Sequence, residues 1–140
     1  MERRKFCTRI GAGTLAAGVT VPLFSSAFEN SEARLNTESL KNGEIRHMVI
    51  FNLYHDKGSD LADKFLKDGQ QILSNIHVVQ QFQVFEQVSL KNDYTYGFSM
   101  VFADKKTFDA YINHPDHVAF VENRWKKEVT RFLEIDLKKH

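Results

Sequence analysis

The segment 93–102 constrains the fold of this chain more than any other, because its large and small side chains alternate with a period of two. That period predicts a β-strand with one aromatic-rich face, formed by Tyr94, Tyr96, Phe98, Met100 and Phe102. Soon after it comes the segment 111–117, Tyr-Ile-Asn-His-Pro-Asp-His, where a helix should end and a second helix should begin at the proline. The two segments together bring a tyrosine and two histidines close to an aromatic strand. Such a combination is suited to a small pocket that contains a proton-transfer group.

Other periodic patterns predict three more strands, at 45–54, 79–88 and 132–137. A helix should begin near Ser59 or Asp60, a short helix should follow the cap residue Asp104, and another should begin at Pro115. The connection 90–93 is too short for a crossover, so the second and third strands should form an antiparallel hairpin. This order predicts an α+β fold, the ferredoxin-like split βαβ sandwich.

The helical patterns also predict which side chains are buried. For the first helix we expect an inward stripe of Leu61, Phe65, Leu66, Gly69, Ile72, Leu73 and Ile76, and for the helix after Pro115 an inward face of Val118, Val121 and Trp125. Glycine costs about 1 kcal/mol relative to alanine inside a helix. Gly69 therefore suggests that another group lies close to the helix at that point.

One face of the predicted sheet has no cover within the chain. Its side chains would form a partly apolar patch of Met48, Ile50, Tyr54 and Phe85, interleaved with Gln81, Gln83 and Gln87. A second copy of the same sheet is the simplest cover, so we expect a homodimer.

The first 27 residues predict a cleavable export signal of the twin-arginine type. Arg3 and Arg4 precede a mildly apolar run, 10–24, which is shorter than the roughly 20 apolar residues that a membrane span requires. Cleavage could follow Ala27 or Ala33. We therefore expect a signal at 1–27, a polar flexible spacer at 28–43, a periplasmic or secreted mature protein, and no stable membrane anchor.

Removal of residues 1–27 changes the formal net charge from +1 to about −2, because that segment carries four basic residues and one acidic residue. A domain of this charge has no basic field for nucleic acid. Cys7 is the one cysteine of the chain and leaves with the signal, which excludes disulfides from the mature protein. We expect no cofactor.

His117 is the strongest candidate for chemistry, because a helix N-terminus disfavours the charged imidazolium and keeps the ring available as a base. His47 should share the inner face of the first strand, and Tyr111 comes from the preceding helix. We predict that His117, His47 and Tyr111 are catalytic. The predicted ligand-binding residues are Tyr94, Tyr96, Phe98, His114 and Glu86.

Structural roles are the alternatives for these same residues. His114 and His117 could cap a helix, His47 could be a satisfied core histidine, and the aromatic residues could be core. Glu86 should point inward and would need a partner, such as Tyr96 or Arg124. A metal site formed by the three histidines has weak support, because no carboxylate stands at a spacing that marks it as a further ligand. We therefore predict no metal.

The order of residues from Asp93 to Trp125, within the span 45–137, resembles the stress-responsive A/B barrel (Dabb) family. The resemblance implies a Dabb domain at 44–138 and a dimeric α/β barrel. Some enzymes of this family use residues like His117, His47 and Tyr111 to cyclise a polyketide-like substrate through an aldol reaction. This chain has Gln70 where those enzymes have a further tyrosine.

Two functions remain open at this point. The first is a histidine-dependent cyclase, lyase or isomerase that acts next to a carbonyl group. The second is a non-catalytic dimeric module that binds a small aromatic or carbonyl-bearing ligand, or that acts in a stress response. Fold resemblance alone does not separate them.

Overall fold

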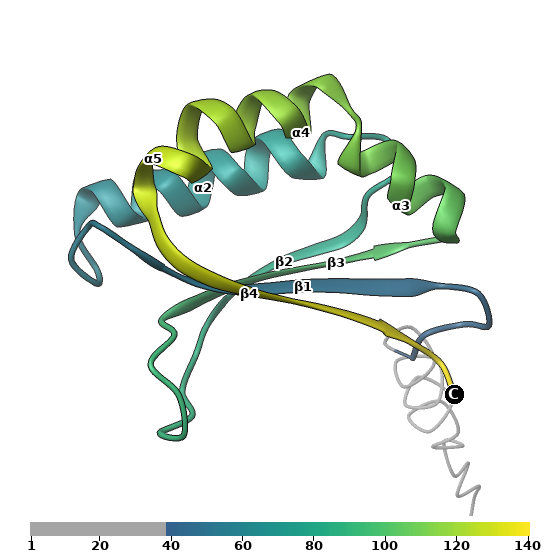
Figure 1. Ribbon diagram of the computed structural model, residues 1–140, viewed down its shortest axis with the longest axis horizontal. Helices are drawn as coiled ribbons and strands as arrows, with labels where there is room; N and C mark the ends of the chain where they lie inside the picture. Colours follow the sequence, from purple (N-terminus) through teal and green to yellow (C-terminus); the bar gives the residue numbers. More distant parts are fainter. Residues whose placement is uncertain (1–38) are drawn as a thin grey trace, which may run out of the picture. The chain divides into compact units, whose positions relative to one another are not determined.

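The computed structural model describes residues 39–140, which form the predicted succession of strands and helices (Figure 1). The predicted export signal and most of the predicted spacer lie outside these residues. The elements are β1 (Ile45–Leu53), α2 (Asp60–Ser74), β2 (Gln80–Glu86), β3 (Tyr96–Phe102), α3 (Lys105–Ile112), α4 (Pro115–Phe120), the π-helix η1 (Val121–Trp125), α5 (Lys126–Glu128) and β4 (Val129–Lys138).

The four strands form one sheet in the order β2-β3-β1-β4. Every neighbouring pair is antiparallel, and β2 and β3 form the predicted hairpin. In the register between β1 and β4, His47 is opposite Asp136 and Val49 is opposite Glu134. The prediction of a ferredoxin-like α+β fold is confirmed.

The helices all lie on one side of the sheet, and the core fills the space between the two layers (Figure 1). β1 alternates as its sequence predicts, so that His47, Val49 and Phe51 are buried beneath the helices. The other large core residues include Phe65, Phe98, Met100, Phe102, Tyr111 and Phe120. Burial of one such side chain contributes about 1.5–3 kcal/mol to folding. The aromatic content of the chain therefore supplies much of its stability.

Side chains at the predicted positions cap the helices. Ser59 accepts a hydrogen bond from the backbone N–H of Ala62 at the start of α2. Asp104 and Thr107 form a capping box at the start of α3. These contacts satisfy backbone donors that a helix start leaves unpaired, which fixes where each helix begins.

Gly69 lies where α2 approaches two aromatic rings. A Cβ atom at this position would be 2.9 Å from Cζ of Phe98 and 3.2 Å from Cζ of Phe120. The close approach explains why glycine is present despite its cost in a helix, and it confirms the interpretation of Gly69 from the sequence.

Two predicted inward residues point outward instead. Leu61 is 59% exposed and Val118 is 47% exposed, whereas Ala62 and Phe120 are buried. In α2 the buried stripe runs through Ala62 and Phe65, and Leu61 lies about 100° away from Ala62 around the helix. After α4 the chain changes to a π-helix, whose longer turn shifts the inward face, and the sequence pattern alone does not reveal such a turn.

The face of the sheet opposite the helices carries apolar side chains without a cover among the described residues. Met48 and Ile50 are half-buried, while Phe85 is exposed. β4 adds Leu133, Ile135 and Leu137 to this open face. These three residues extend the predicted patch beyond the residues expected from the sequence.

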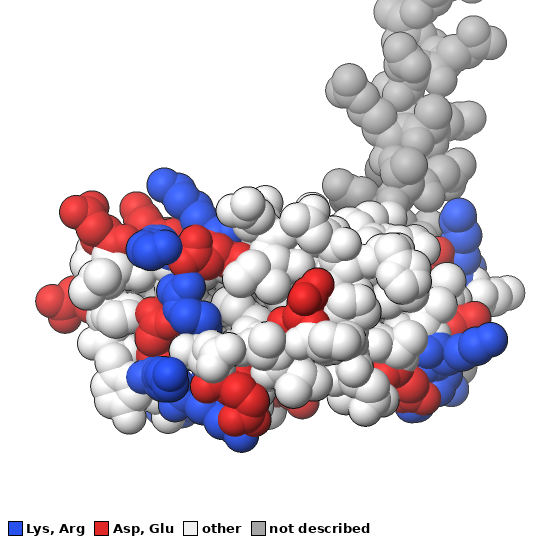
Figure 2. Space-filling view, turned by 90° about the horizontal axis from the view of Figure 1, so that it is seen from above, with Lys and Arg blue, Asp and Glu red and all other residues white. Residues whose placement is uncertain are grey.

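Figure 2 shows the face formed by the helices. Acidic and basic side chains lie side by side toward its two ends, with a mostly uncharged surface between them. Neither sign of charge dominates this face. Among residues 39–140, no helix has the length and apolar character needed to cross a bilayer.

Candidate functional site

A cavity of about 410 Å³ lies between the helical layer and the sheet. Its size falls within the range of small-molecule pockets. Most of its lining is apolar, and the polar lining residues are His47, Tyr111, His117, Lys126 and Glu134. The cavity is therefore mostly apolar, with a few polar groups on its wall.

The break between α3 and α4 positions His117. Pro115 has no backbone N–H, and the N–H of Asp116 donates instead to Nδ1 of His114 over 3.2 Å. The carbonyl oxygen of Ile112, at the end of α3, therefore receives no hydrogen bond from the backbone of residue 115 or 116. Nδ1 of His117 lies 3.0 Å from that oxygen.

This contact determines which nitrogen of His117 can act as a base. A carbonyl oxygen only accepts hydrogen bonds, so Nδ1 must carry the proton and donate it. The lone pair of the neutral ring is then on Nε2. Burial lowers the pKa of His117, the bond to Ile112 opposes that effect, and the nearby His47 lowers the pKa further. His117 is therefore neutral near pH 7.

Tyr111 lies beside His117, with a distance of 4.4 Å between the two ring centroids. Its side chain is 2% exposed, and its hydroxyl makes no hydrogen bond to another described residue. Burial raises the pKa of Tyr111, and the charge of Glu134 raises it further. The hydroxyl thus keeps its proton and can donate it to a molecule in the cavity.

His47 completes the group from the sheet side. Its ring centroid is 6.2 Å from that of Tyr111. Its Nδ1 lies 2.7 Å from Oδ1 of Asp136, the residue opposite it in the β1–β4 register. The carboxylate accepts this hydrogen bond, so the ring orientation of His47 is fixed by β4. The structure thus brings the three predicted catalytic residues together at one cavity.

Of the five predicted ligand-binding residues, one lines the cavity and four lie outside it. Phe98 lines the cavity, but the structure places the others elsewhere. His114 is the N-cap of α4. The ring of Tyr94 packs against the guanidinium of Arg131, with 4.5 Å between that group and the ring centroid.

Tyr96 and Glu86 belong to a second hollow of about 260 Å³, beside the loop between β1 and α2. The hydroxyl of Tyr96 accepts a hydrogen bond from the N–H of Gly58 over 3.1 Å. Glu86 is exposed and forms an ion pair with Lys57, rather than with Tyr96 or Arg124. Neither side chain lines the larger cavity.

Sequence reasoning missed the contribution of β4 to the cavity, above all Glu134. Phe132, Glu134 and Asp136 alternate along β4 and face the helical layer together with His47. The alternation was visible in the sequence. If the fourth strand is paired antiparallel with the first, these alternating residues lie beside His47.

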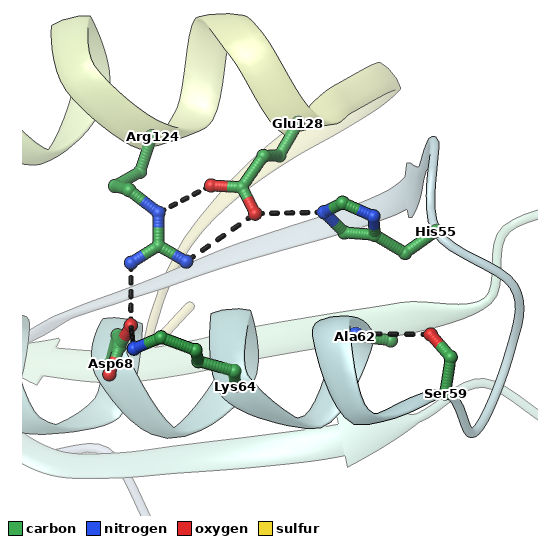
Figure 3. A network of polar contacts seen from close by, with 7 residues as sticks. All are labelled: His55, Ser59, Ala62, Lys64, Asp68, Arg124 and Glu128. Atoms are coloured by element: carbon green, nitrogen blue, oxygen red, sulfur yellow. Dashed lines mark hydrogen bonds and ion pairs between the residues drawn. The ribbon is translucent and has the colours of Figure 1, made fainter.

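A polar network holds η1 and α5 against α2 (Figure 3). Arg124 donates to Glu128 and, over 2.6 Å, to Asp68 of α2. Nε2 of His55, just after β1, lies 2.8 Å from Oε1 of Glu128. Lys64 and Arg124 lower the pKa of Asp68. Because Trp125 follows Arg124 directly and lines the cavity, the network fixes that part of the wall.

Within the described span, no cluster of three or more His, Cys, Asp or Glu side chains is arranged to hold a metal ion. His114 and His47 each use Nδ1 in a contact with the protein itself.

The family described as Stress responsive A/B Barrel Domain matches residues 45–139. A stress-response A/B barrel domain-containing protein of Arabidopsis thaliana is 30% identical over 80 residues, which cover 54% of this chain and 69% of that protein.

Solved structures share the fold. A Dabb family protein with a ferredoxin-like fold from Mesorhizobium loti is 48% identical, with a TM-score of 0.69 over 71% of this chain and 99% of that one. A protein from Bacteroides fragilis, described as dimeric, ferredoxin-like and of unknown function, is 16% identical, with a TM-score of 0.55 over 72% of this chain and 100% of that one. At that identity the second likeness concerns the fold alone.

Proposed function

The chain belongs to the stress-responsive A/B barrel domain family, and we propose that its cavity binds a small carbonyl-bearing compound on which His117 acts as a general base. His117 would remove a proton from the carbon next to the carbonyl group, as a cyclase, lyase or isomerase does. The observation that carries this proposal is the 3.0 Å contact between Nδ1 of His117 and the oxygen of Ile112. It leaves the lone pair on Nε2 of a neutral ring that lines the cavity.

The other groups would act on the carbonyl oxygen. Removal of the proton places negative charge on that oxygen, and a hydrogen-bond donor aimed at it lowers the barrier. Tyr111 supplies such a donor, because its hydroxyl is protonated and makes no other hydrogen bond among the described residues. The apolar part of the wall lowers the local dielectric, which strengthens these interactions.

The pair between His47 and Asp136 favours a second candidate function, a non-catalytic binding module. His47 is 5% exposed and already has a carboxylate partner, as expected of a satisfied core histidine. In such a module, His117 and Tyr111 would orient a carbonyl-bearing ligand without reacting with it.

Hydrogen–deuterium exchange separates the two functions. The protein would be mixed in heavy water with the ketone 4-phenylbutan-2-one, and NMR would follow exchange at the carbons next to the carbonyl. A general base in the cavity predicts exchange well above that of buffer alone. Binding of the ketone without faster exchange supports the module and contradicts the catalytic proposal.

The open face of the sheet supports a homodimer. One chain supplies a four-stranded open sheet, so the barrel that gives the family its name needs a second sheet. The half-buried and exposed apolar residues of this face are the surface that such a partner would cover. The dimeric protein from Bacteroides fragilis has the same fold, which is consistent with this assembly.

Export remains part of the proposal and rests on the sequence of residues 1–27. If Arg3 and Arg4 are read by an export receptor, replacement of both by lysine should leave the precursor in the cytoplasm. Cell fractionation and immunoblotting measure the outcome. Unchanged export of the double variant would contradict the twin-arginine assignment.

A further inference from the structure

Glu134 is an unpaired carboxylate on the wall of the cavity. It lies in β4 opposite Val49, lines the cavity, and is exposed, so it stands where the cavity opens. Within residues 39–140 its side chain has no hydrogen bond and no ion pair. Its negative charge nevertheless raises the pKa of Tyr111 and opposes the lowering of the pKa of His117. Glu134 is therefore close to the polar end of the cavity.

The other charges on the wall have partners. Lys126 forms an ion pair with Glu122, one turn earlier on the same helical segment. His47 pairs with Asp136, and His117 and Tyr111 are neutral near pH 7. The charge that a ligand meets without a partner is consequently that of Glu134.

The polar groups of the wall also differ in whether they donate a hydrogen bond to a ligand or accept one from it. A carboxylate only accepts hydrogen bonds, and Nε2 of His117 likewise offers a lone pair. Tyr111 contributes a donor. A matching ligand would present an acceptor, such as a carbonyl oxygen, to Tyr111 and a hydrogen-bond donor to Glu134.

From this arrangement we propose that Glu134 selects the ligand. The ligand is a compound with an apolar body and a head group that donates a hydrogen bond, either a hydroxyl or an ammonium group. It carries no carboxylate. The proposal rests on the proposed function, because it assigns the ligand class of the same cavity. A carboxylate in the ligand would meet the unpaired charge of Glu134 at the opening of the cavity, where the two like charges repel. A hydroxyl or ammonium group would instead satisfy that charge.

Three probes of one shape test the proposal: 4-phenylbutan-1-ol, 4-phenylbutylamine and 4-phenylbutyrate. Trp125 is the one tryptophan of the chain and lines the cavity, so its fluorescence reports binding. We expect the alcohol and the ammonium compound to bind the wild-type protein at least about tenfold more tightly than the carboxylate. The relative affinity of alcohol and ammonium then shows which donor the site prefers.

Variants of Glu134 give the decisive comparison. Glu134→Gln should reduce the penalty on 4-phenylbutyrate to less than about threefold, and Glu134→Lys should make the carboxylate the tightest of the three probes. Glu44→Gln makes the same chemical change outside the cavity and should leave the wild-type order intact. An unchanged order in both Glu134 variants would overturn the assignment of Glu134. Failure of all three probes to bind the wild-type protein would overturn the cavity as a binding site, and the proposed function with it.

Discussion

Nδ1 of His117 lies 3.0 Å from the carbonyl oxygen of Ile112, across the break between two helices. The contact exists because Pro115 cannot donate to that part of α3 and because His114 engages the N–H of Asp116. One short sequence, His-Pro-Asp-His, thus ends one helix, begins the next, and fixes the tautomer of a histidine in a cavity.

The dependence of exchange on pH should follow His117. Burial lowers the pKa of this ring from its ordinary value of 6.5, and only the neutral ring can accept a proton. We expect a constant rate of enzyme-dependent exchange from pH 8 down to about pH 6.5, and a decline below that as the ring becomes protonated. A decline that begins above pH 7 would contradict a lowered pKa. Rates with 4-phenylbutan-2-one across buffers of equal ionic strength provide the measurement.

Gly69→Ala should lower the free energy of unfolding by about 1–2 kcal/mol. The new methyl group would meet the rings of Phe98 and Phe120 at 2.9 and 3.2 Å, which overpacks the core. An overpacking cost of about 2–3 kcal/mol, in the upper part of the usual range, outweighs the gain of about 1 kcal/mol in helix propensity. Gln70→Ala, at the exposed neighbouring position, is the matched control and should change stability by less than about 0.5 kcal/mol. Urea denaturation compares them, and a more stable Gly69→Ala would show that the rings can move aside.

Ile50→Asp should convert the proposed dimer into a monomer. Ile50 lies on the open face, and a specific interface of ordinary size would bury about 1,600 Å² there. A buried, unpaired carboxylate in that contact is costly. Leu61→Asp places the same charge on an exposed residue of α2 and should leave the dimer intact. Light scattering at micromolar concentration gives the masses, and a wild-type monomer would refute the sheet-to-sheet assembly.

Arg124→Met should destabilise the protein by about 1–2 kcal/mol near pH 7, because Asp68 and Glu128 lose their charged donor. The folded protein lowers the pKa of both carboxyl groups, so their contribution is present above their ordinary values of 3.8 and 4.5. It disappears as the pH falls through the lower folded values.

The stability difference between wild type and Arg124→Met should therefore shrink in acid. The control is Lys105→Met, which removes an exposed pair with Asp109 and should cost less than about 0.5 kcal/mol. Equal costs for the two variants at pH 7 would mean that the network adds nothing beyond an ordinary surface pair.

The sequence predicts much of the fold because its local signals agree. The period-two pattern of β3, the caps at Ser59 and Asp104, and the proline at the start of α4 each correspond to an observed element. The π-helix is different, because its longer turn comes from packing and has no distinct sequence signature. That is why the inward direction predicted for Val118 was wrong.

The candidate site was predictable in part. His47, Tyr111 and His117 share the cavity as the order of elements suggests, since β1 and the α3–α4 break meet over the same region. Glu134 required the strand pairing of β4 with β1, which joins residues far apart in the sequence. Glu86 and Tyr96 lie opposite each other in the β2–β3 register, at the end of the sheet. Both line the second hollow and not the cavity.

The most direct test of the central claim measures His117→Ala in two ways: the free energy of unfolding and the rate of exchange at the carbons next to the carbonyl of 4-phenylbutan-2-one. If His117 is the base, the rate should fall at least about 100-fold, toward that of buffer. The free energy of unfolding should then change by less than about 1 kcal/mol. Loss of about 1–3 kcal/mol with an unchanged exchange rate would instead identify His117 as a structural residue that joins two helices, and would contradict its role as the base.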